Sequence, residues 1–408
     1  MFLASLVLAS SFIGRARAQC AELPSSLPGV DDLEALSTLP DPFTFYNGTP
    51  LSSVDDWACR QQEIKTLVQH YFYGYYPDTS DEVRVFLRPV FRPSIVYFSR
   101  SLDSPLQTVT AKLSSGWQGQ TLAITIASGG KSSSFNATLS LPSGASADAP
   151  VPAIITLGGF GPSASGTAAV SFDAASVAYD GPLKTGAFWD LYEGDIGVLA
   201  AWGWGFSKII DALEAAVPEV DIERIAVSGC SRYGKAALAA GFFDERVTLT
   251  VPMSSGLMGM APFRFQYEES GANEQLSDMD DTSSSWPDDT LVSFRNDPAR
   301  LPVDSNFVTA GVAPRALIWD EGTTDYWTNP EGTAAVTFPA TLALYEWLGA
   351  GENVGIALRN SGHCDPSGNT NVADFINKVF FGTETDRDYH DISPFTAHEE
   401  TFPFTAPQ

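Results

Sequence analysis

Five short apolar runs, separated by helical patterns, constrain the fold of this chain more than any other feature of its sequence. The runs occupy residues 152–157, 224–227, 247–251, 316–319 and 354–358. A strand that is apolar along its whole length needs cover on both faces, and parallel sheets with helices on each side provide that cover. The sequence therefore predicts an α/β fold, with a mostly parallel sheet at the centre of a three-layer αβα sandwich.

The residues before this region show a different pattern. Residues 56–76 carry apolar side chains at helical spacing, whereas 122–127 and 135–141 alternate between apolar and polar residues, as half-buried strands do. We therefore expect an antiparallel lead-in to the main sheet. No internal repeat or linker of biased composition divides the chain, so residues 19–408 are predicted to form a single domain.

The stretch VSGCSRYGKAAL, residues 227–238, lies where the second apolar run turns into a helical pattern. A serine on such a tight turn is lifted above the sheet and stands at a helix N-terminus, whose amides favour developing negative charge. Ser231 is therefore a candidate nucleophile, and the small residues Gly229 and Gly234 permit the turn. The spacing G-x-S-x-x-G differs from the familiar G-x-S-x-G. By itself, the motif of residues 229–234 is also compatible with a plain turn or with Cys230 as the reactive group.

Histidine is scarce, and the sequence holds only His70, His363, His390 and His398. His363 follows the last apolar run, where a hydrolase with a Ser–acid–His triad on a parallel sheet carries its base. The other three suit solvated or capping roles. Cys230 precedes Ser231 and Cys364 follows His363, so a disulfide between these cysteines would hold the nucleophile turn against the histidine loop. This interpretation makes Ser231 the reactive group and Cys230 a structural one.

Composition narrows the functional classes. A formal net charge of −26 would repel nucleic acids and anionic membranes, which excludes both as partners. Residues 1–18 hold a short apolar run and a small-x-small pattern, as a signal peptide does, so we expect a secreted, extracellular protein. The remaining chain has four cysteines without a Cys-x-x-Cys pair, which favours disulfides over a metal site. We expect no cofactor, and Asn47 and Asn136 begin N-glycosylation motifs.

Several motifs together carry a resemblance to a known family. The run Gly229-Cys-Ser-Arg-Tyr-Gly-Lys235, with Ala201-Trp-Gly-Trp-Gly, Ala313-Pro-Arg-Ala316 and Gly362-His-Cys364, resembles the fungal glucuronoyl esterases. These are secreted serine esterases of the α/β-hydrolase type that cut esters between lignin alcohols and 4-O-methyl-glucuronate on xylan. The resemblance extends from about residue 20 to residue 381 and is interrupted by residues 83–107, which we interpret as an insertion.

The resemblance implies a role for each matching residue. Ser231 would be the nucleophile and His363 its base. Arg232 would stabilise the oxyanion, because its amide follows the nucleophile. Lys235 would hold the sugar from a position one helical turn beyond Ser231. The other matching residues are the substrate-binding Gln275 and Trp327 and two disulfides, Cys20–Cys59 and Cys230–Cys364.

The chain departs from the family at the triad acid. Most fungal members carry it as Glu in a Pro-Gln-Glu-Ser-Gly run, whereas this chain has Pro-Met-Ser-Ser-Gly with Ser254 at that position. The loop after residues 316–319 offers Asp320, Glu321 and Asp325 instead. Bacterial relatives carry an acid two residues before a similarly placed Trp-x-x-Pro, so we predict Asp325 as the triad acid, with Glu321 as the alternative. A sugar-contacting Glu of the family also lacks a clear match, which leaves the preference for the 4-O-methyl sugar open.

These observations give one main hypothesis and two alternatives. The main hypothesis is a monomeric glucuronoyl esterase that acts on lignin esters of glucuronoxylan through an acyl-enzyme on Ser231. A uronic acid held as an ester is neutral, so the acidic surface does not repel it. The alternatives are a serine esterase for another carbohydrate ester, such as acetylated xylan, and a non-catalytic glycan-binding relative.

Overall fold

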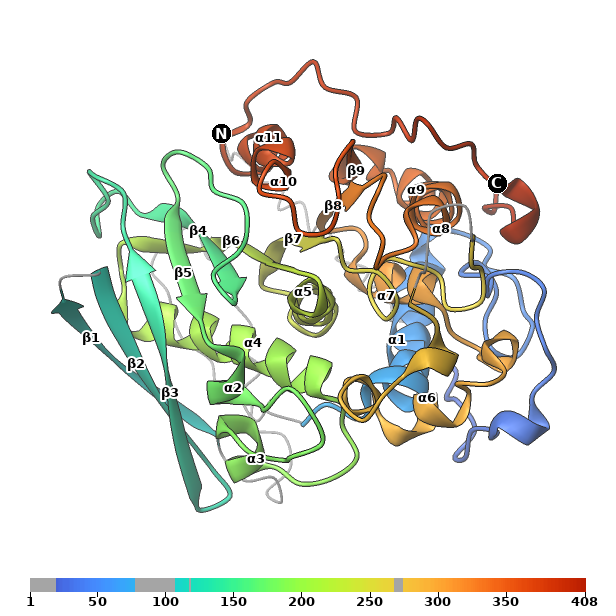
Figure 1. Cartoon of the computed structure of the whole chain (residues 1–408), viewed down its shortest axis with the longest axis horizontal. Helices are drawn as coiled ribbons and strands as arrows, with labels where there is room; N and C mark the ends of the chain where they lie inside the picture. The colour runs from blue at the N-terminus through green and yellow to red at the C-terminus, as the bar shows by residue number, and fades with distance from the viewer. Residues whose placement is uncertain (1–19, 78–106, 117–118, 268–273) are drawn as a thin grey trace, which may run out of the picture.

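A single large sheet organises the part of the chain that the computed structural model describes, residues 20–77, 107–116, 119–267 and 274–408. In these ranges nine strands lie in the order β1-β2-β3-β5-β4-β6-β7-β8-β9 (Figure 1). All pairs from β5 across to β9 are parallel, which confirms the predicted mostly parallel sheet. The strands are β1 (Thr108–Gly116), β2 (Gly119–Ser128), β3 (Lys131–Ser140), β4 (Val151–Leu157), β5 (Ala168–Phe172), β6 (Val220–Cys230), β7 (Val247–Met253), β8 (Ala316–Gly322) and β9 (Val354–Arg359).

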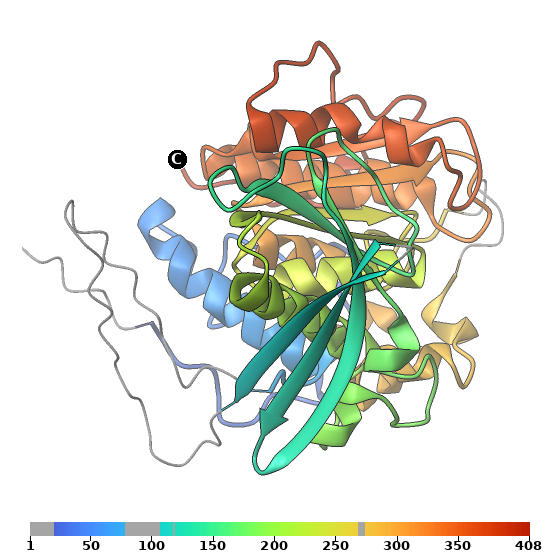
Figure 2. The ribbon, with the colours of Figure 1, turned by 90° about the vertical axis from the view of Figure 1, so that its left-hand side faces the viewer.

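The strands β1, β2 and β3 form the antiparallel lead-in that the alternating pattern predicts. In β2 and β3 every second side chain is buried, and Ile124 faces Phe135 across the pair. By contrast, every residue of β8 is buried, as expected for a strand with cover on both faces. Figure 2 looks onto the three lead-in strands, which twist away from the parallel part of the sheet.

Helices cover both faces of the parallel strands. Along β4, Ile154 packs into one core with α11, and the next residue, Ile155, packs into the larger core on the opposite face with α4 and α5. Figure 2 shows these helical layers above and below the sheet, which confirms the three-layer αβα sandwich. The helices are α1 (Trp57–Val68), α2 (Ala174–Val177), α3 (Ala187–Leu191), α4 (Val198–Ala216), α5 (Arg232–Phe243), α6 (Asp289–Ser293), α7 (Ser305–Val312), α8 (Pro330–Gly332), α9 (Phe338–Trp347), α10 (Gly368–Asn371) and α11 (Ala373–Phe381).

The structure describes the predicted N-terminal helix and the glycosylation candidates, but not the predicted signal peptide. The helical stripe in residues 56–76 corresponds to α1 and a further turn over Gln69–Tyr73. Asn47 and Asn136, the two glycosylation candidates, are both exposed. The signal peptide at residues 1–18 and nearly all of the insertion at 83–107 lie outside the described residues. No helix in the described ranges is long and apolar enough to cross a membrane.

A buried carboxyl group at the start of α6 makes the fold sensitive to pH. The Asp288 Oδ1 accepts a hydrogen bond from the Leu291 amide at 2.9 Å and caps the helix. Burial, with the nearby charges of Asp195 and Asp289, raises the pKa of Asp288 to about 7. Because the folded state favours the protonated acid, its contribution to stability is present at low pH and is lost as pH rises from about 4 through 7.

Replacing Asp288 by Asn keeps a good N-cap and removes this titration. We expect the free energy of unfolding of the wild type to fall relative to that of Asp288→Asn between pH 4 and pH 8, by at most about 4 kcal/mol. Urea unfolding of both proteins at the two pH values measures this difference. An equal stability difference at both pH values would contradict the buried, protonated state of Asp288.

Candidate active site

Ser231 occupies a strained turn between a strand and a helix. It follows the last residue of β6 and precedes the first residue of α5, with φ 60° and ψ −131°. Glycines make room for the turn, because a Cβ on Gly229 would lie 2.6 Å from the Tyr233 carbonyl oxygen and one on Gly234 would lie 2.8 Å from that of Met253. Non-glycine residues with positive φ cost energy and gather at functional sites. The strand–turn–helix arrangement predicted around Ser231 is therefore confirmed.

His363 lies in the loop after β9 and is bound to Asp325. The His363 Nδ1 is 2.8 Å from the Asp325 Oδ2 and 3.1 Å from its Oδ1. Asp325 is fully buried, whereas the imidazole keeps 25% of its surface exposed. Burial alone would raise the pKa of Asp325, but the hydrogen bond to His363 and the other contacts of the carboxylate outweigh burial and hold that pKa below its usual value. The pair thus combines an ionised acid with an accessible imidazole.

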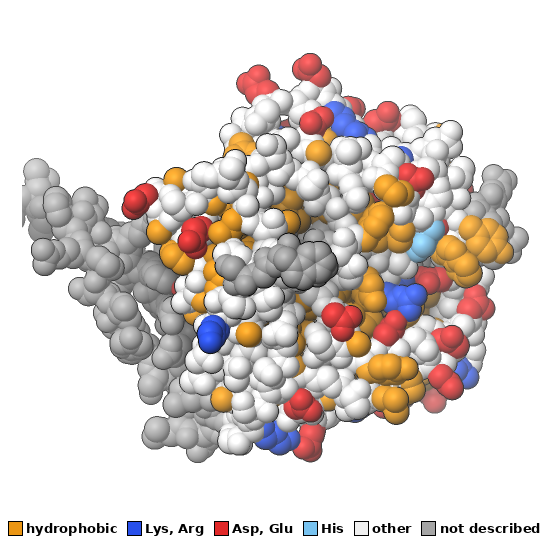
Figure 3. Space-filling view, turned by 60° about the vertical axis from the view of Figure 1, so that its left-hand side comes forward, with side chains coloured by type: hydrophobic (Ala, Val, Ile, Leu, Met, Phe, Trp, Pro, Cys, Tyr) orange, Lys and Arg blue, Asp and Glu red, His pale blue; other side chains and the backbone are white. Residues whose placement is uncertain are grey.

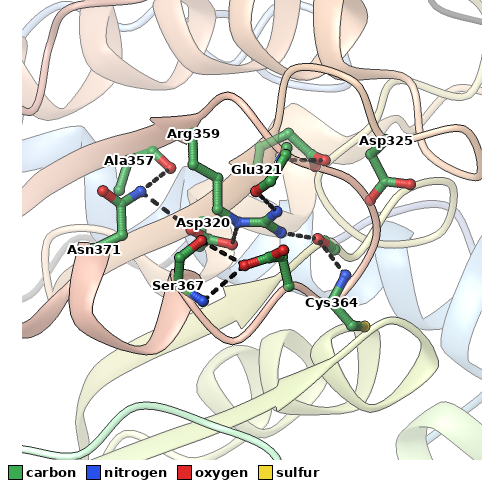
Figure 4. A network of polar contacts seen from close by, with 12 residues as sticks. Asp320, Glu321, Asp325, Ala357, Arg359, Cys364, Ser367 and Asn371 are labelled. Carbon is green, nitrogen blue, oxygen red and sulfur yellow. Dashed lines mark hydrogen bonds and ion pairs between the residues drawn. The ribbon is translucent and has the colours of Figure 1, made fainter.

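The other two acidic residues considered for this role do not contact the histidine. Asp320 belongs to the end of β8, and its Oδ2 binds the Arg359 Nε at 2.8 Å (Figure 4). Glu321 is buried, and its Oε1 accepts the Thr328 hydroxyl at 2.8 Å. Burial, and then the charge of Asp325, raise the pKa of Glu321 well above its usual value. Burial therefore favours the neutral form of Glu321.

A disulfide joins the nucleophile turn to the histidine loop. Cys230 and Cys364 are bonded, with their Cα atoms 5.9 Å apart, and Cys20 is bonded to Cys59, so both predicted disulfides are confirmed. Ser231 and His363 are each the direct chain neighbour of a bridged cysteine. Among the described residues, the Ser231 hydroxyl and the His363 ring are not joined by a hydrogen bond. Such contacts often tighten only when substrate binds.

Two cations and a tryptophan lie beside the Ser231 turn. Arg232 is 44% exposed and pairs through Nη1 with Asp180 at 2.7 Å. Lys235 is almost fully buried, and its Nζ is 2.8 Å from the Glu274 Oε2. The Trp286 ring lies under both cations, 5.7 Å from the Arg232 guanidinium carbon and 5.2 Å from the Lys235 Nζ. Its Nε1 donates to Asp180 at 2.9 Å, so one carboxylate fixes both the ring and the arginine.

The remaining predicted substrate-binding residues come from two loops that meet. The Glu274 amide donates to the Trp327 carbonyl at 3.2 Å, and this contact brings the loop of Gln275 next to that of Trp327. Gln275 is exposed, and Trp327 keeps 56% of its surface exposed. Figure 3 shows one face of the molecule on which a histidine, basic and acidic side chains reach the surface among hydrophobic ones.

Sequence reasoning missed Asp180 and Glu274. Asp180 meets Arg232 from 52 residues away, and Glu274 meets Lys235 from 39 residues away. Neither contact produces a local pattern in the sequence. The one available signal is that Glu274 directly precedes Gln275, for which the family resemblance implies a role in substrate binding.

Removing the Cys230–Cys364 bridge tests how much it supports the site. It closes a loop of 134 residues, and the chain-entropy model gives up to about 5 kcal/mol for a loop of that length. We expect a Cys230→Ala, Cys364→Ala double variant to lose stability in urea and to weaken the downfield NMR signal of the His363 Nδ1 proton. The matched control is Cys20→Ala with Cys59→Ala, which should lose up to about 4 kcal/mol and keep that signal. Loss of the signal in both variants equally would contradict a specific role of the first bridge.

Comparisons with known proteins agree with this geometry. A family model described as glucuronyl esterase of fungi matches residues 124–349. The 4-O-methyl-glucuronoyl methylesterase of Hypocrea jecorina is 34% identical over 374 residues, which cover 88% of this chain and 74% of that protein.

Solved structures resemble the whole fold. A carbohydrate esterase family 15 glucuronoyl esterase from Caldicellulosiruptor kristjansonii has a TM-score of 0.77 and 35% identity, and the match covers 93% of this chain and 99% of the other. A serine-to-alanine variant of the glucuronoyl esterase from Sporotrichum thermophile, in complex with methyl 4-O-methyl-β-D-glucopyranuronate, has a TM-score of 0.74 and 27% identity over 92% of this chain and 96% of the other. The α/β-hydrolase type of fold is thereby confirmed. The chain belongs to the fungal glucuronyl esterase family and is a carboxylic-ester hydrolase.

Proposed function

We propose that this protein hydrolyses the esters that join 4-O-methyl-glucuronate of glucuronoxylan to lignin alcohols, with Ser231 as its nucleophile. The observation that carries the proposal is the His363–Asp325 hydrogen bond, held beside the strained Ser231 turn by the Cys230–Cys364 bridge. A serine, an imidazole and a buried carboxylate in this relation form the machinery for acyl transfer.

The chemistry follows from the positions of these groups. The Ser231 hydroxyl attacks the ester carbonyl while the His363 Nε2 accepts its proton, and Asp325 holds the opposite ring nitrogen and stabilises the imidazolium. Arg232 begins α5, so its amide is free of an intrahelical partner and can donate to the oxyanion. The imidazolium then gives its proton to the departing alcohol. Water attacks the acyl-enzyme in the second half of the reaction and releases the uronic acid.

The sugar-binding role of Lys235 is supported by its environment. Its ammonium is buried and paired with Glu274, so the pair offers both donors and acceptors to sugar hydroxyls without a net charge. Gln275 and the exposed indole of Trp327 complete the proposed binding surface. The ester substrate is neutral, whereas the product carboxylate is anionic, and the net charge of −26 favours its release.

We further propose that the protein works outside the cell as a monomeric single domain of residues 19–408, after removal of residues 1–18. Its two disulfides fit an oxidising compartment. Asn47 and Asn136 are exposed and would be accessible to glycosylation.

A panel of substrates tests the proposed function. We expect turnover of benzyl glucuronate and of methyl 4-O-methyl-glucuronate, and Ser231→Ala should lower kcat by at least about 10³-fold with an unchanged circular dichroism spectrum. An aryl acetate and a xylan pull-down serve as comparisons. Turnover of the aryl acetate alone would indicate an esterase for a different carbohydrate ester, and xylan binding without turnover would indicate a non-catalytic relative.

Two isosteric substitutions test the choice of triad acid. Asp325→Asn should lower kcat by about 10⁴-fold, because the amide cannot stabilise the imidazolium and favours the wrong tautomer. Glu321→Gln should change kcat by less than about threefold, because glutamine resembles the neutral form that burial favours there and Glu321 does not bind His363. Steady-state kinetics on benzyl glucuronate decides between them. The opposite ranking of the two variants would transfer the role to Glu321.

A further inference from the structure

A buried arginine ties three strand ends to the histidine loop. Arg359 ends β9 and is 8% exposed. Its Nε donates to the Asp320 Oδ2 at 2.8 Å on β8, and its Nη2 donates to the Ser254 Oγ at 2.8 Å just after β7. Its Nη1 donates to the Ser361 Oγ at 2.6 Å and to the Gly362 carbonyl oxygen, both in the loop that carries the histidine (Figure 4). The guanidinium therefore fixes the approach of this loop to the sheet.

The Ser254 hydroxyl has its acceptor sites filled. It accepts hydrogen bonds from the Arg359 Nη2 and from the Cys364 amide, the latter at 3.4 Å. A hydroxyl has two acceptor lone pairs and a single proton, so that proton remains to be donated. The Ser254 hydroxyl is one of the groups that lower the pKa of Asp325, after His363 and the Trp327 amide. The Ser254 backbone has φ 41°, and its amide is bound to the Asp320 carbonyl at 2.8 Å, which holds the hydroxyl in place.

We propose that Arg359 and Ser254 are positioning residues for the reaction, acting through a relay from Arg359 to Ser254 to Asp325 to His363. Arg359 orients the Ser254 hydroxyl toward the Asp325 carboxylate and fixes the histidine loop through Ser361 and Gly362. Ser254 directly follows β7, and Arg359 is the last residue of β9. The inference rests on the proposed roles of Asp325 and His363.

Charged groups near the Asp325–His363 pair influence the pH dependence of kcat/KM. From β8, burial raises the pKa of Glu321 and of Asp320, and the Arg359 guanidinium opposes this shift at Asp320. Arg387, from the C-terminal tail, binds the Asn371 side chain that also contacts Asp320.

On the histidine loop itself, Asp365 is exposed and bound by Ser367. Arg359 is thus the cation that compensates Asp320. Its loss leaves the Ser254 hydroxyl without the donor that orients it toward Asp325. An Asp325 carboxylate that lacks the Ser254 donor stabilises the imidazolium more strongly, which moves the acidic limb of the kcat/KM profile to higher pH.

Three single variants separate the charge of Arg359 from its hydrogen bonds. Arg359→Gln and Ser254→Ala should each lower kcat by about 10- to 100-fold and move the acidic limb upward by about half a pH unit or more. Arg359→Lys keeps the charge but not the contact with Ser254, so it should lower kcat and move the acidic limb as Ser254→Ala does. Profiles are measured with benzyl glucuronate.

A double variant and a matched control complete the set. Asp320→Asn with Arg359→Gln removes both partners of the ion pair but still lacks the contact with Ser254, so kcat should stay low and the limb should stay where Arg359→Gln places it. This variant also avoids an unpaired buried anion if Arg359→Gln folds poorly. The control is Arg264→Gln, at the equally buried Arg264–Asp304 pair, whose Nε–Oδ2 distance is 3.2 Å. It should lower the unfolding temperature without moving the acidic limb.

The proposal is overturned if Ser254→Ala and the arginine variants change only the unfolding temperature, or if Arg264→Gln moves the limb equally. A failure of the proposed function is distinct, because wild-type protein would then lack turnover of the ester or Asp325→Asn would stay active. The downfield His363 Nδ1 proton gives a readout that needs no turnover. Its chemical shift should change in Ser254→Ala and remain constant in Arg264→Gln, and an unchanged shift in Ser254→Ala would contradict the relay.

Discussion

The parallel pairing of β6, β7, β8 and β9 is the constraint on which the site depends. Cys230 pairs with Met253, Met253 with Asp320, and Gly322 with Arg359. Because parallel strands end at the same edge of a sheet, each neighbour delivers its next residues to one place. Ser231, Ser254, the loop of Asp325 and the loop of His363 therefore converge, although they span more than a hundred residues of sequence.

Within this frame, environment assigns different states to chemically similar groups. Asp325 and Glu321 lie four residues apart, yet a hydrogen bond to His363 lowers the pKa of the first, and burial raises that of the second. Carboxyl groups whose environments push their pKa values apart take different roles in one site. Asp320, which directly precedes Glu321, is paired with the Arg359 guanidinium. Ionisation, rather than residue type, thus decides which acid supports the imidazole.

Sequence alone predicted the parts of this arrangement that produce local or neighbour patterns. Apolar runs predicted the parallel strands, and the flanking cysteines predicted the bridge between the Ser231 turn and the His363 loop. Asp325 required the resemblance to relatives as well. The contacts of Lys235 with Glu274 and of Arg359 with Ser254 could not be predicted, since the second joins residues 105 positions apart. Such contacts depend on which loops come together at the edge of the sheet. The hydrophobic periodicity of the sequence carries no information about that.

We propose that the bridged turn and the histidine–aspartate pair together activate Ser231 as a nucleophile. Labelling with a fluorophosphonate, followed by peptide mapping under non-reducing conditions, tests this claim most directly, because the reagent bonds covalently to an activated serine. We expect one adduct per chain, on Ser231 in the peptide that remains linked through Cys230 to Cys364. An adduct on a different residue, or an unlabelled Ser231 in protein that still hydrolyses glucuronate esters, would contradict it.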